Sequence, residues 1–328
     1  DLMFARPAAL QATAPAPARG LERDALRLMV STSREEVHAH FRDLPQFLQP
    51  GDVLVVNESA TIPASLPAER APGPFVLNLS TRFGNGLWLA EPRWSAAQQG
   101  PLPIVRGEHA RVAGMEARFI MPCPGLPRLW FVQLMGDVDA AMARYGEPIR
   151  YGYVHDTYPL EAYQTVFARV PGSAEMPSAA YPFTQSLVAA LEARGVCIAR
   201  LVLHTGVSSL EVEAEEVESQ PLLPEPFEVP TATAEAVNRA RDGGRRVIAV
   251  GTTVVRALES AWDGAQVQPK RGLTRLYVHP GRGVHAIDGL ITGLHDPVTS
   301  HLALLYALAG RDRMQRAYAE AVREGYLW

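Results

Sequence analysis

The clearest hydrophobic pattern of the chain lies at residues 247–250, where four apolar residues follow one another without polar alternation. Such a run predicts a strand that is buried on both faces. Gly251 interrupts the run, and Thr252 and Thr253 are residue types that begin helices. Apolar residues then recur at helical spacing up to residue 260. The pattern therefore predicts a strand, a tight turn and a helix in direct succession.

Similar patterns occur toward both ends of the chain. Apolar runs predict strands at 26–30, 53–56 and 196–203, and two more at 276–278 and 284–287. Helical spacing predicts helices at 35–48, 184–194, 231–242, 300–309 and 311–324. Alternation of strands and helices is typical of an α/β domain. We therefore expect a main α/β domain built from both chain ends, residues 1–60 and 136–328.

The segment between these two parts has a different hydrophobic pattern. From residue 61 to about 135 the helical periodicity is lost, and short alternating segments at 75–79, 87–90, 117–120 and 129–133 are separated by Gly and Pro. This pattern is typical of a small antiparallel sheet or barrel. The sequence thus predicts that residues 61–135 form an inserted β-barrel domain.

Composition and charge bear on whether the protein binds nucleic acid, metal or membranes. The 328 residues carry a formal net charge of −4, so nucleic acid would have to be bound through a local patch. The two cysteines, Cys123 and Cys197, form no metal motif, which favours a reducing, cytoplasmic setting. No apolar run reaches membrane-spanning length, so we expect no membrane contact. We favour a monomer, although the sequence leaves the oligomeric state open.

Several polar residues follow predicted strands. Asn57, His204, Thr252 and Asp288 would converge on one edge of the sheet if their strands are neighbours. A strand that turns through Gly251 into a helix also points free backbone N–H groups and a positive helix end at one spot. An ordinary strand–helix unit without a ligand, and a structural histidine, remain alternatives. Motifs of the HExxH, CxxC and GxSxG types are absent from the sequence, so we predict no metal site.

Longer matches point to one family. They comprise residues 247–260, the His279-Pro280-Gly281 turn, and residues 290–295. Residues 42–45, 50–57, 62–64, 163–168, 172–173 and 203–204 extend the match over most of the chain. Together they resemble the QueA family, the S-adenosylmethionine:tRNA ribosyltransferase-isomerases of queuosine synthesis. The chain departs from the family where Asp-Thr-Arg is replaced by Glu58-Ser59-Ala60, and where a His is replaced by Pro182, which suggests a divergent paralogue.

The resemblance implies a two-domain enzyme that needs no metal and uses S-adenosylmethionine as a co-substrate. Members transfer the ribosyl part of S-adenosylmethionine to an aminomethyl-deazaguanine in the wobble position of tRNA, releasing adenine and methionine and forming an epoxycyclopentanediol. This chemistry needs a base for the carbon next to the sulfonium, a donor for adenine, and a cleft without water.

The resemblance also suggests roles for individual residues. His204 could be the base or the acid, and Asp288 and Glu259 could hold ribose hydroxyls or orient a partner. The Gly251 backbone, with Thr252 and Thr253, could bind the methionine carboxylate at the helix end. The expected substrate-binding set is completed by Asn57, Arg256 and His295.

Three functions remain open at this stage: the family reaction on tRNA, related chemistry on a small-molecule acceptor, and non-catalytic binding by the same fold. The missing Arg and His count against the first function. The retained turn at Gly251, together with His204 and Asp288, counts against the third.

Overall fold

The computed structural model describes residues 4–71, 73–95, 102–150, 153–154, 156–207 and 222–328. Its strands are β1 (Arg27–Ser31), β2 (Glu36–His40), β3 (Val53–Asn57), β4 (Ser59–Thr61), β5 (Ser65–Arg70), β6 (Gly73–Gly84), β7 (Leu87–Arg93), β8 (His109–Val112), β9 (Met115–Cys123), β10 (Leu126–Met135), β11 (Val170–Ser173), β12 (Cys197–Leu203), β13 (Glu225–Val229), β14 (Val247–Val250), β15 (Lys270–Thr274) and β16 (Gly289–Ile291). The α-helices are α1 (Val138–Tyr145), α2 (Gln185–Ala193), α3 (Thr231–Asp242), α4 (Thr252–Ser260), α5 (Ser300–Ala309) and α6 (Arg311–Arg323). Short 3-10 helices span Ala8–Leu10, Ala16–Arg19, Arg23–Ala25, Phe41–Phe47, Leu160–Tyr163 and Ser178–Ala180.

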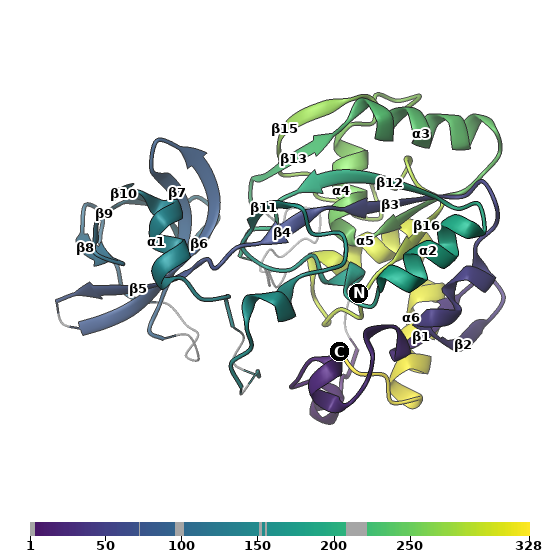
Figure 1. The fold of residues 1–328 in the computed structure, drawn as a ribbon, viewed down its shortest axis with the longest axis horizontal. Coiled ribbons are helices and arrows are strands. Elements are labelled where there is room, and N and C mark those ends of the chain that lie inside the picture. Colours follow the sequence, from purple (N-terminus) through teal and green to yellow (C-terminus); the bar gives the residue numbers. More distant parts are fainter. Residues whose placement is uncertain (1–3, 72, 96–101, 151–152, 155, 208–221) are drawn as a thin grey trace.

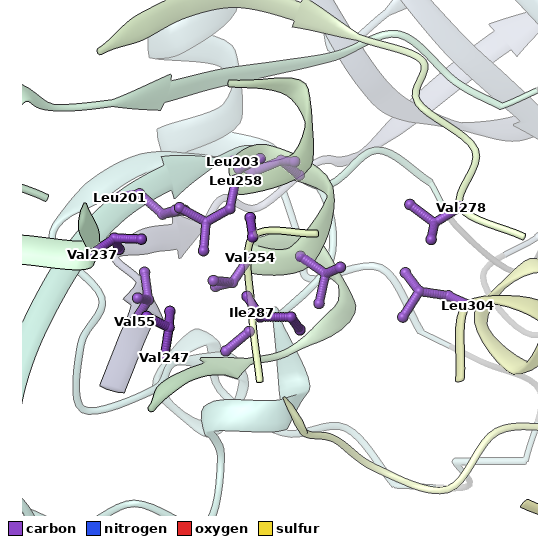
Figure 2. Packing of buried hydrophobic residues seen from close by; sticks show 14 of the residues in the cluster. Val55, Leu201, Leu203, Val237, Val247, Val254, Leu258, Val278, Ile287 and Leu304 are labelled. Atoms are coloured by element: carbon purple, nitrogen blue, oxygen red, sulfur yellow. The ribbon is translucent and has the colours of Figure 1, made fainter. Parts of the chain in front are cut away.

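The main domain is organised around a mixed sheet with the strand order β15-β13-β12-β3-β14-β16. Strands β12, β3, β14 and β16 are parallel, whereas β13 and β15 are antiparallel additions at one edge. Both faces of the central strands β3 and β14 are covered. In β3, Val53 and Val55 belong to the core that includes residues of α3, α4, α5 and α6, whereas Leu54 and Val56 pack toward α2. Figure 2 shows Val55 in this core with residues of α3, α4 and α5. Burial on both faces explains the uninterrupted apolar runs of β3 and β14, whereas β12 contains Arg200 and β16 is only half-buried.

The barrel is a separate lobe beside the main domain (Figure 1). It closes with the strand order β10-β7-β6-β5-β8-β9, and all of its described pairings are antiparallel. Buried side chains such as Leu66, Leu77 and Phe119 fill its interior. The predicted fold class, an α/β domain with a small antiparallel β-barrel, is confirmed. The boundaries proposed for the two domains stay a prediction.

Three predictions of local structure were wrong. The segment 35–48 is not an α-helix but consists of β2 and a 3-10 helix, Phe41–Phe47, with Pro45 inside it. Proline removes a backbone donor and disfavours an α-helical residue before it, so an α-helix cannot run through this segment undisturbed. The predicted strands at 276–278 and 284–287 are also absent. Val278 and Ile287 are buried core residues in irregular backbone, and the nearby strands are β15 and β16.

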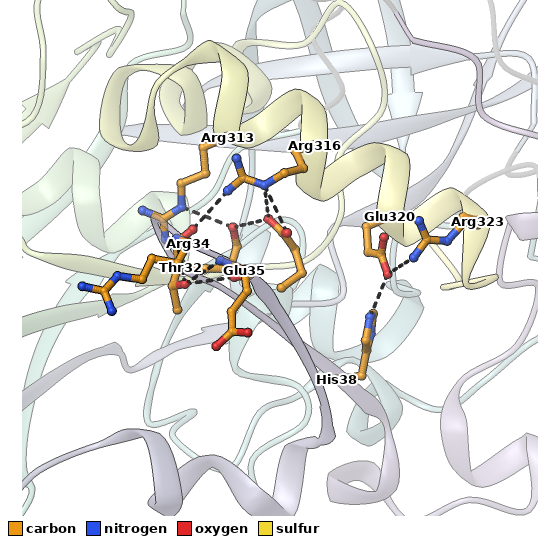
Figure 3. Close-up of polar contacts among 10 residues, drawn as sticks. Thr32, Arg34, Glu35, His38, Arg313, Arg316, Glu320 and Arg323 are labelled. Atoms are coloured by element: carbon orange, nitrogen blue, oxygen red, sulfur yellow. Dashed lines mark hydrogen bonds and ion pairs between the residues drawn. The ribbon is translucent and has the colours of Figure 1, made fainter.

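The β1–β2 hairpin packs on the C-terminal helix α6 through polar contacts (Figure 3). Arg313 donates to the Ser31 carbonyl, and Arg316 donates to the Glu36 carboxylate at 3.2 Å. The chain ends also meet, because Trp328 N donates to the Leu10 carbonyl at 2.8 Å. Within the described ranges, no helix is both long and apolar enough to cross a membrane.

Candidate functional site

The carboxyl edge of the main sheet carries a row of polar groups. Because β12, β3, β14 and β16 are parallel, their carboxyl ends share one edge. His204 follows β12, Asn57 ends β3, Gly251 follows β14, and Thr292 follows β16. The structure thus brings together the strand ends that the sequence predicted to converge, except for Asp288.

Asn57 joins three elements at this edge. Its amide nitrogen donates to the Leu203 carbonyl at 2.8 Å and to Thr253 Oγ1 at 3.3 Å. Its amide oxygen accepts from the backbone N–H groups of Leu203 and Ser59, at 3.0 and 3.1 Å. The side chain is buried, and both of its polar atoms have partners in the protein. Asn57 therefore holds the ends of β3, β12 and α4 in register at the edge where we predicted a substrate contact.

His204 is fixed on one side and open on the other. Its Nδ1 lies 2.7 Å from Ser59 Oγ, and its backbone N–H donates to the Pro226 carbonyl. The ring packs on the backbone of Gly172, where an added Cβ would lie 2.5 Å from ring atoms. Burial lowers the pKa of His204 below its ordinary value, so the ring is neutral at pH 7. Within the described residues Nε2 makes no hydrogen bond, which leaves it available to a ligand.

The turn at Gly251 aims helix α4 at the same edge. Gly251 has φ 99° and ψ 151°, a conformation that an L-residue rarely adopts, and its N–H donates to the Ile291 carbonyl. The N–H groups of Thr252 and Thr253 follow at the start of α4. In the described chain these two N–H groups have no recorded acceptor, as expected for the first turn of a helix. They could hold a carboxylate or another anion.

One turn farther along α4, Arg256 forms a buried ion pair with Glu225. The other Glu225 oxygen accepts from Gly206 N at 2.9 Å, and Arg256 Nε donates to the Leu276 carbonyl at 3.0 Å. The pair thus ties α4 to the segment after His204. Arg256 Nη2 is buried and has no hydrogen-bond partner among the described residues, so the expected contact of Arg256 with the substrate stays a prediction.

A histidine pair lies beside this ion pair. The rings of His295 and His301 stack with their centroids 4.8 Å apart, and His295 Nε2 lies 2.8 Å from Thr292 Oγ1. Burial lowers the pKa of His295 well below its ordinary value, and His301 adds to the effect. Burial and the Arg256 charge lower the pKa of His301 to about 4, although Glu225 opposes them. Both rings are therefore neutral at pH 7.

Two predicted catalytic residues do not lie in this row. Asp288 precedes β16, and its carboxylate accepts from the N–H of Val247, the first residue of β14, at 2.8 Å. The expected convergence of Asp288 with His204 is therefore wrong, because the strand after Asp288 begins at the opposite edge of the sheet. Glu259 has a fully buried carboxylate that binds Arg282 and the backbone N–H groups of His285 and Ala286.

The partners that orient His204 were not predicted from the sequence. Ser59, Ser173 and Gly172 contact or support its ring, although up to 145 residues separate these positions from it. Ser59 had a local signal, since it lies in a polar cluster at a strand end, but that cluster also has the composition of a turn. Within the described residues, no three His, Cys, Asp or Glu side chains are grouped as metal ligands.

Comparison with known proteins adds the family context. The family model for queuosine biosynthesis proteins matches residues 1–328. An S-adenosylmethionine:tRNA ribosyltransferase-isomerase from Anaeromyxobacter dehalogenans is 38% identical, covering 99% of this chain and 95% of the relative. A protein of the same name from Thermus thermophilus is 41% identical, covering 93% and 90%. The crystal structure of S-adenosylmethionine tRNA ribosyltransferase from Thermotoga maritima matches with a TM-score of 0.54 and 28% identity, covering 99% of this chain and 95% of that one.

Proposed function

The chain belongs to the queuosine biosynthesis protein family, and from this we propose that it is an S-adenosylmethionine:tRNA ribosyltransferase-isomerase. The single observation that carries the proposal is the family match over the whole chain. Its co-substrate is S-adenosylmethionine, and its acceptor is a deazaguanine base in tRNA. The products are the epoxycyclopentanediol-modified tRNA, adenine and methionine.

The polar edge of the sheet is the proposed place of this chemistry. A reaction that passes through a deprotonated carbon next to a sulfonium needs groups that are fixed before the substrate arrives. His204 is such a group, since Ser59 and Gly172 hold its ring and Nε2 remains available. We assign it contact with the reacting part of S-adenosylmethionine.

The start of α4 is the proposed site for the methionine carboxylate. Among the described residues the N–H groups of Thr252 and Thr253 have no acceptor, and together with the positive end of the helix they favour an anion there. The Thr252 side chain is buried beside these donors. Asn57, which reaches both Leu203 and Thr253, would then set the distance between the carboxylate and His204.

The remaining predicted site residues support these contacts. We propose that Arg256 and His295 support this edge through their contacts with Glu225 and Thr292 respectively, and that the remaining donor of Arg256, Nη2, faces the substrate. Asp288 and Glu259 fix backbone segments away from the edge. As the formal net charge of the chain is −4, tRNA would be held by a local basic patch and not by a general positive field.

The test is adenine release from S-adenosylmethionine, with and without tRNA that carries the aminomethyl-deazaguanine. We expect release only with the modified tRNA, and a loss of about 100-fold or more in His204→Ala with a melting temperature close to that of the wild type. Release with a small deazaguanine and not with tRNA would replace the acceptor. Absence of adenine under both conditions would contradict the proposed enzyme.

A further inference from the structure

Ser173, Ser59 and His204 form a chain of hydrogen bonds that ends at the polar edge of the sheet. Ser59 Oγ lies 2.6 Å from Ser173 Oγ and 2.7 Å from His204 Nδ1. The two serines lie on the parallel strands β4 and β11, and their exposed fractions are 1% and 0%. Because both serine side chains are buried, their hydroxyl protons need hydrogen-bond acceptors within the protein.

The direction of these hydrogen bonds follows from counting protons. Each serine hydroxyl has one proton to donate and can accept further ones. Ser173 Oγ already accepts from the Thr205 N–H at 3.0 Å. If Ser173 donates to Ser59 and Ser59 donates to His204 Nδ1, both hydroxyl protons have acceptors. The imidazole is then neutral and carries its proton on Nε2.

The opposite direction leaves one proton without an acceptor. If His204 Nδ1 donated to Ser59, then Ser59 would donate to Ser173. The Ser173 proton would then have no recorded acceptor among the described residues. A buried donor without an acceptor is costly, and the imidazolium form would incur the same cost because it also protonates Nδ1. Burial of His204 disfavours the imidazolium as well, which is the direction in which its pKa moves.

We propose that Ser173 and Ser59 are positioning residues that hold His204 as the neutral Nε2–H tautomer, so that His204 meets its ligand as a hydrogen-bond donor. This proposal rests on the proposed function. It implies that His204 donates a hydrogen bond to the departing adenine and does not remove the proton next to the sulfonium. When the bond between ribose and adenine breaks, its electron pair stays on the adenine nitrogen. Nε2–H stabilises that charge by a hydrogen bond and keeps its proton, and water protonates adenine after release.

The tautomer is tested directly by nitrogen NMR of the full chain with ¹⁵N-labelled histidine. The His204→Gln variant identifies the His204 signals by their loss. We expect a protonated Nε2 and an unprotonated Nδ1 between about pH 7 and 8, above the ordinary pKa of histidine. Ser59→Ala should give a mixture of tautomers, and Ser59→Thr should restore the Nε2–H form because it retains the hydroxyl. A proton on Nδ1 in the wild type would overturn the proposal, and no variant is needed for that result.

Kinetics then separate positioning from a merely structural role. Ser59→Ala should lower kcat for adenine release by about 10-fold or more with little change in KM for S-adenosylmethionine, since the lost tautomer affects the transition state. Ser59→Thr should recover most of the rate. Ser186→Ala on the exposed side of α2 is the matched control and should behave as the wild type. A Ser59→Ala enzyme with the wild-type kcat would contradict the positioning role.

The experiments distinguish failure of the proposed function from failure of the positioning role of the two serines. If the wild type shows the Nε2–H tautomer but releases no adenine, the hydrogen-bond chain stands and the proposed function fails. If adenine is released while Nδ1 carries the proton, the function stands and the positioning proposal fails.

Discussion

Replacing Glu259 with Gln should destabilise the folded protein without abolishing adenine release. The Glu259 side chain is fully buried on α4. One oxygen accepts from the backbone N–H groups of His285 and Ala286 at 2.6 and 2.7 Å. The other accepts from Arg282 at 2.6 Å and lies 3.3 Å from the ring nitrogen Nδ1 of His285. These contacts fix the irregular segment after residue 281 against the helix. The substitution keeps the shape of the side chain and removes its charge.

The magnitude follows from what each oxygen loses. The oxygen that remains in Gln can still accept from the two backbone N–H groups, although without a charge. The amide nitrogen would face the Arg282 guanidinium, donor against donor, and a buried cation would lose its partner. Breaking one charge-assisted bond costs about 1.5–3 kcal/mol, and removing one partner of a buried ion pair costs about 3–5 kcal/mol. Because Arg282 is partly exposed, we expect about 2–4 kcal/mol in the free energy of unfolding.

Acid should narrow the difference between the wild type and the variant. Burial alone would raise the pKa of Glu259, but the bonds from Ala286, Arg282 and His285 outweigh it and lower the pKa below the ordinary value. A depressed carboxyl pKa stabilises the fold above the unfolded-state pKa of about 4.3, and this stabilisation is lost as the pH falls through the folded-state value. The difference in unfolding free energy between the wild type and the variant should therefore begin to narrow below about pH 4.3 and close as the pH falls through the lower folded-state pKa.

The assay is urea unfolding at pH 7, together with adenine release at a temperature where both proteins are folded. The control is Glu235→Gln on α3, which removes an exposed ion pair with Arg239 and should change the unfolding free energy by less than about 0.5 kcal/mol. A Glu259→Gln protein with wild-type stability and no adenine release would refute the reasoning, because the carboxylate would then act on the substrate.

Three further outcomes can be measured. Gly172→Ala places a methyl group against the His204 ring, so adenine release should fall by about 10-fold or more and stability by about 1–3 kcal/mol; wild-type values for both would exclude this contact. Thr252→Val keeps the backbone N–H groups of α4 and removes the side-chain hydroxyl, so it should weaken S-adenosylmethionine binding by about 1–2 kcal/mol in calorimetry only if the hydroxyl also binds the ligand; unchanged affinity would remove the hydroxyl from the site. His301, with a folded-state pKa of about 4, should make the wild type lose stability as the pH falls from about 6.5 to 4, because the unfolded chain binds the proton first. His301→Gln should flatten that part of the pH–stability curve, and an unaltered curve would contradict the assignment.

The sequence predicted those parts of the fold that local patterns determine. The uninterrupted run at 247–250 indicated a strand covered on both faces, and the loss of helical spacing after residue 61 indicated the barrel. The helix predicted at 35–48 failed because apolar spacing was given more weight than Pro45. Val278 and Ile287 are buried as their apolar character suggests, but burial does not distinguish a strand from an irregular segment that packs on a helix.

The candidate site was predictable as far as strand direction could be inferred. His204 and Gly251 follow strands that are parallel neighbours of β3, so their position at one edge followed from topology. Asp288 was misplaced because the strand beside it starts after that residue and does not end there. The contact between Ser59 and Ser173 joins positions 114 residues apart, and no local pattern carries that information.

The distribution of strand pairings along the chain has a consequence for folding during synthesis. The barrel pairs strands that all lie between Ser65 and Met135, so it can close once that stretch has left the ribosome. Strand β3 can pair only much later in synthesis, because its neighbours β12 and β14 begin at Cys197 and Val247. Non-local pairings are slow to form and leave apolar strands exposed in the meantime. We expect nascent chains stalled before β12 to hold a protease-resistant barrel beside an unprotected β3.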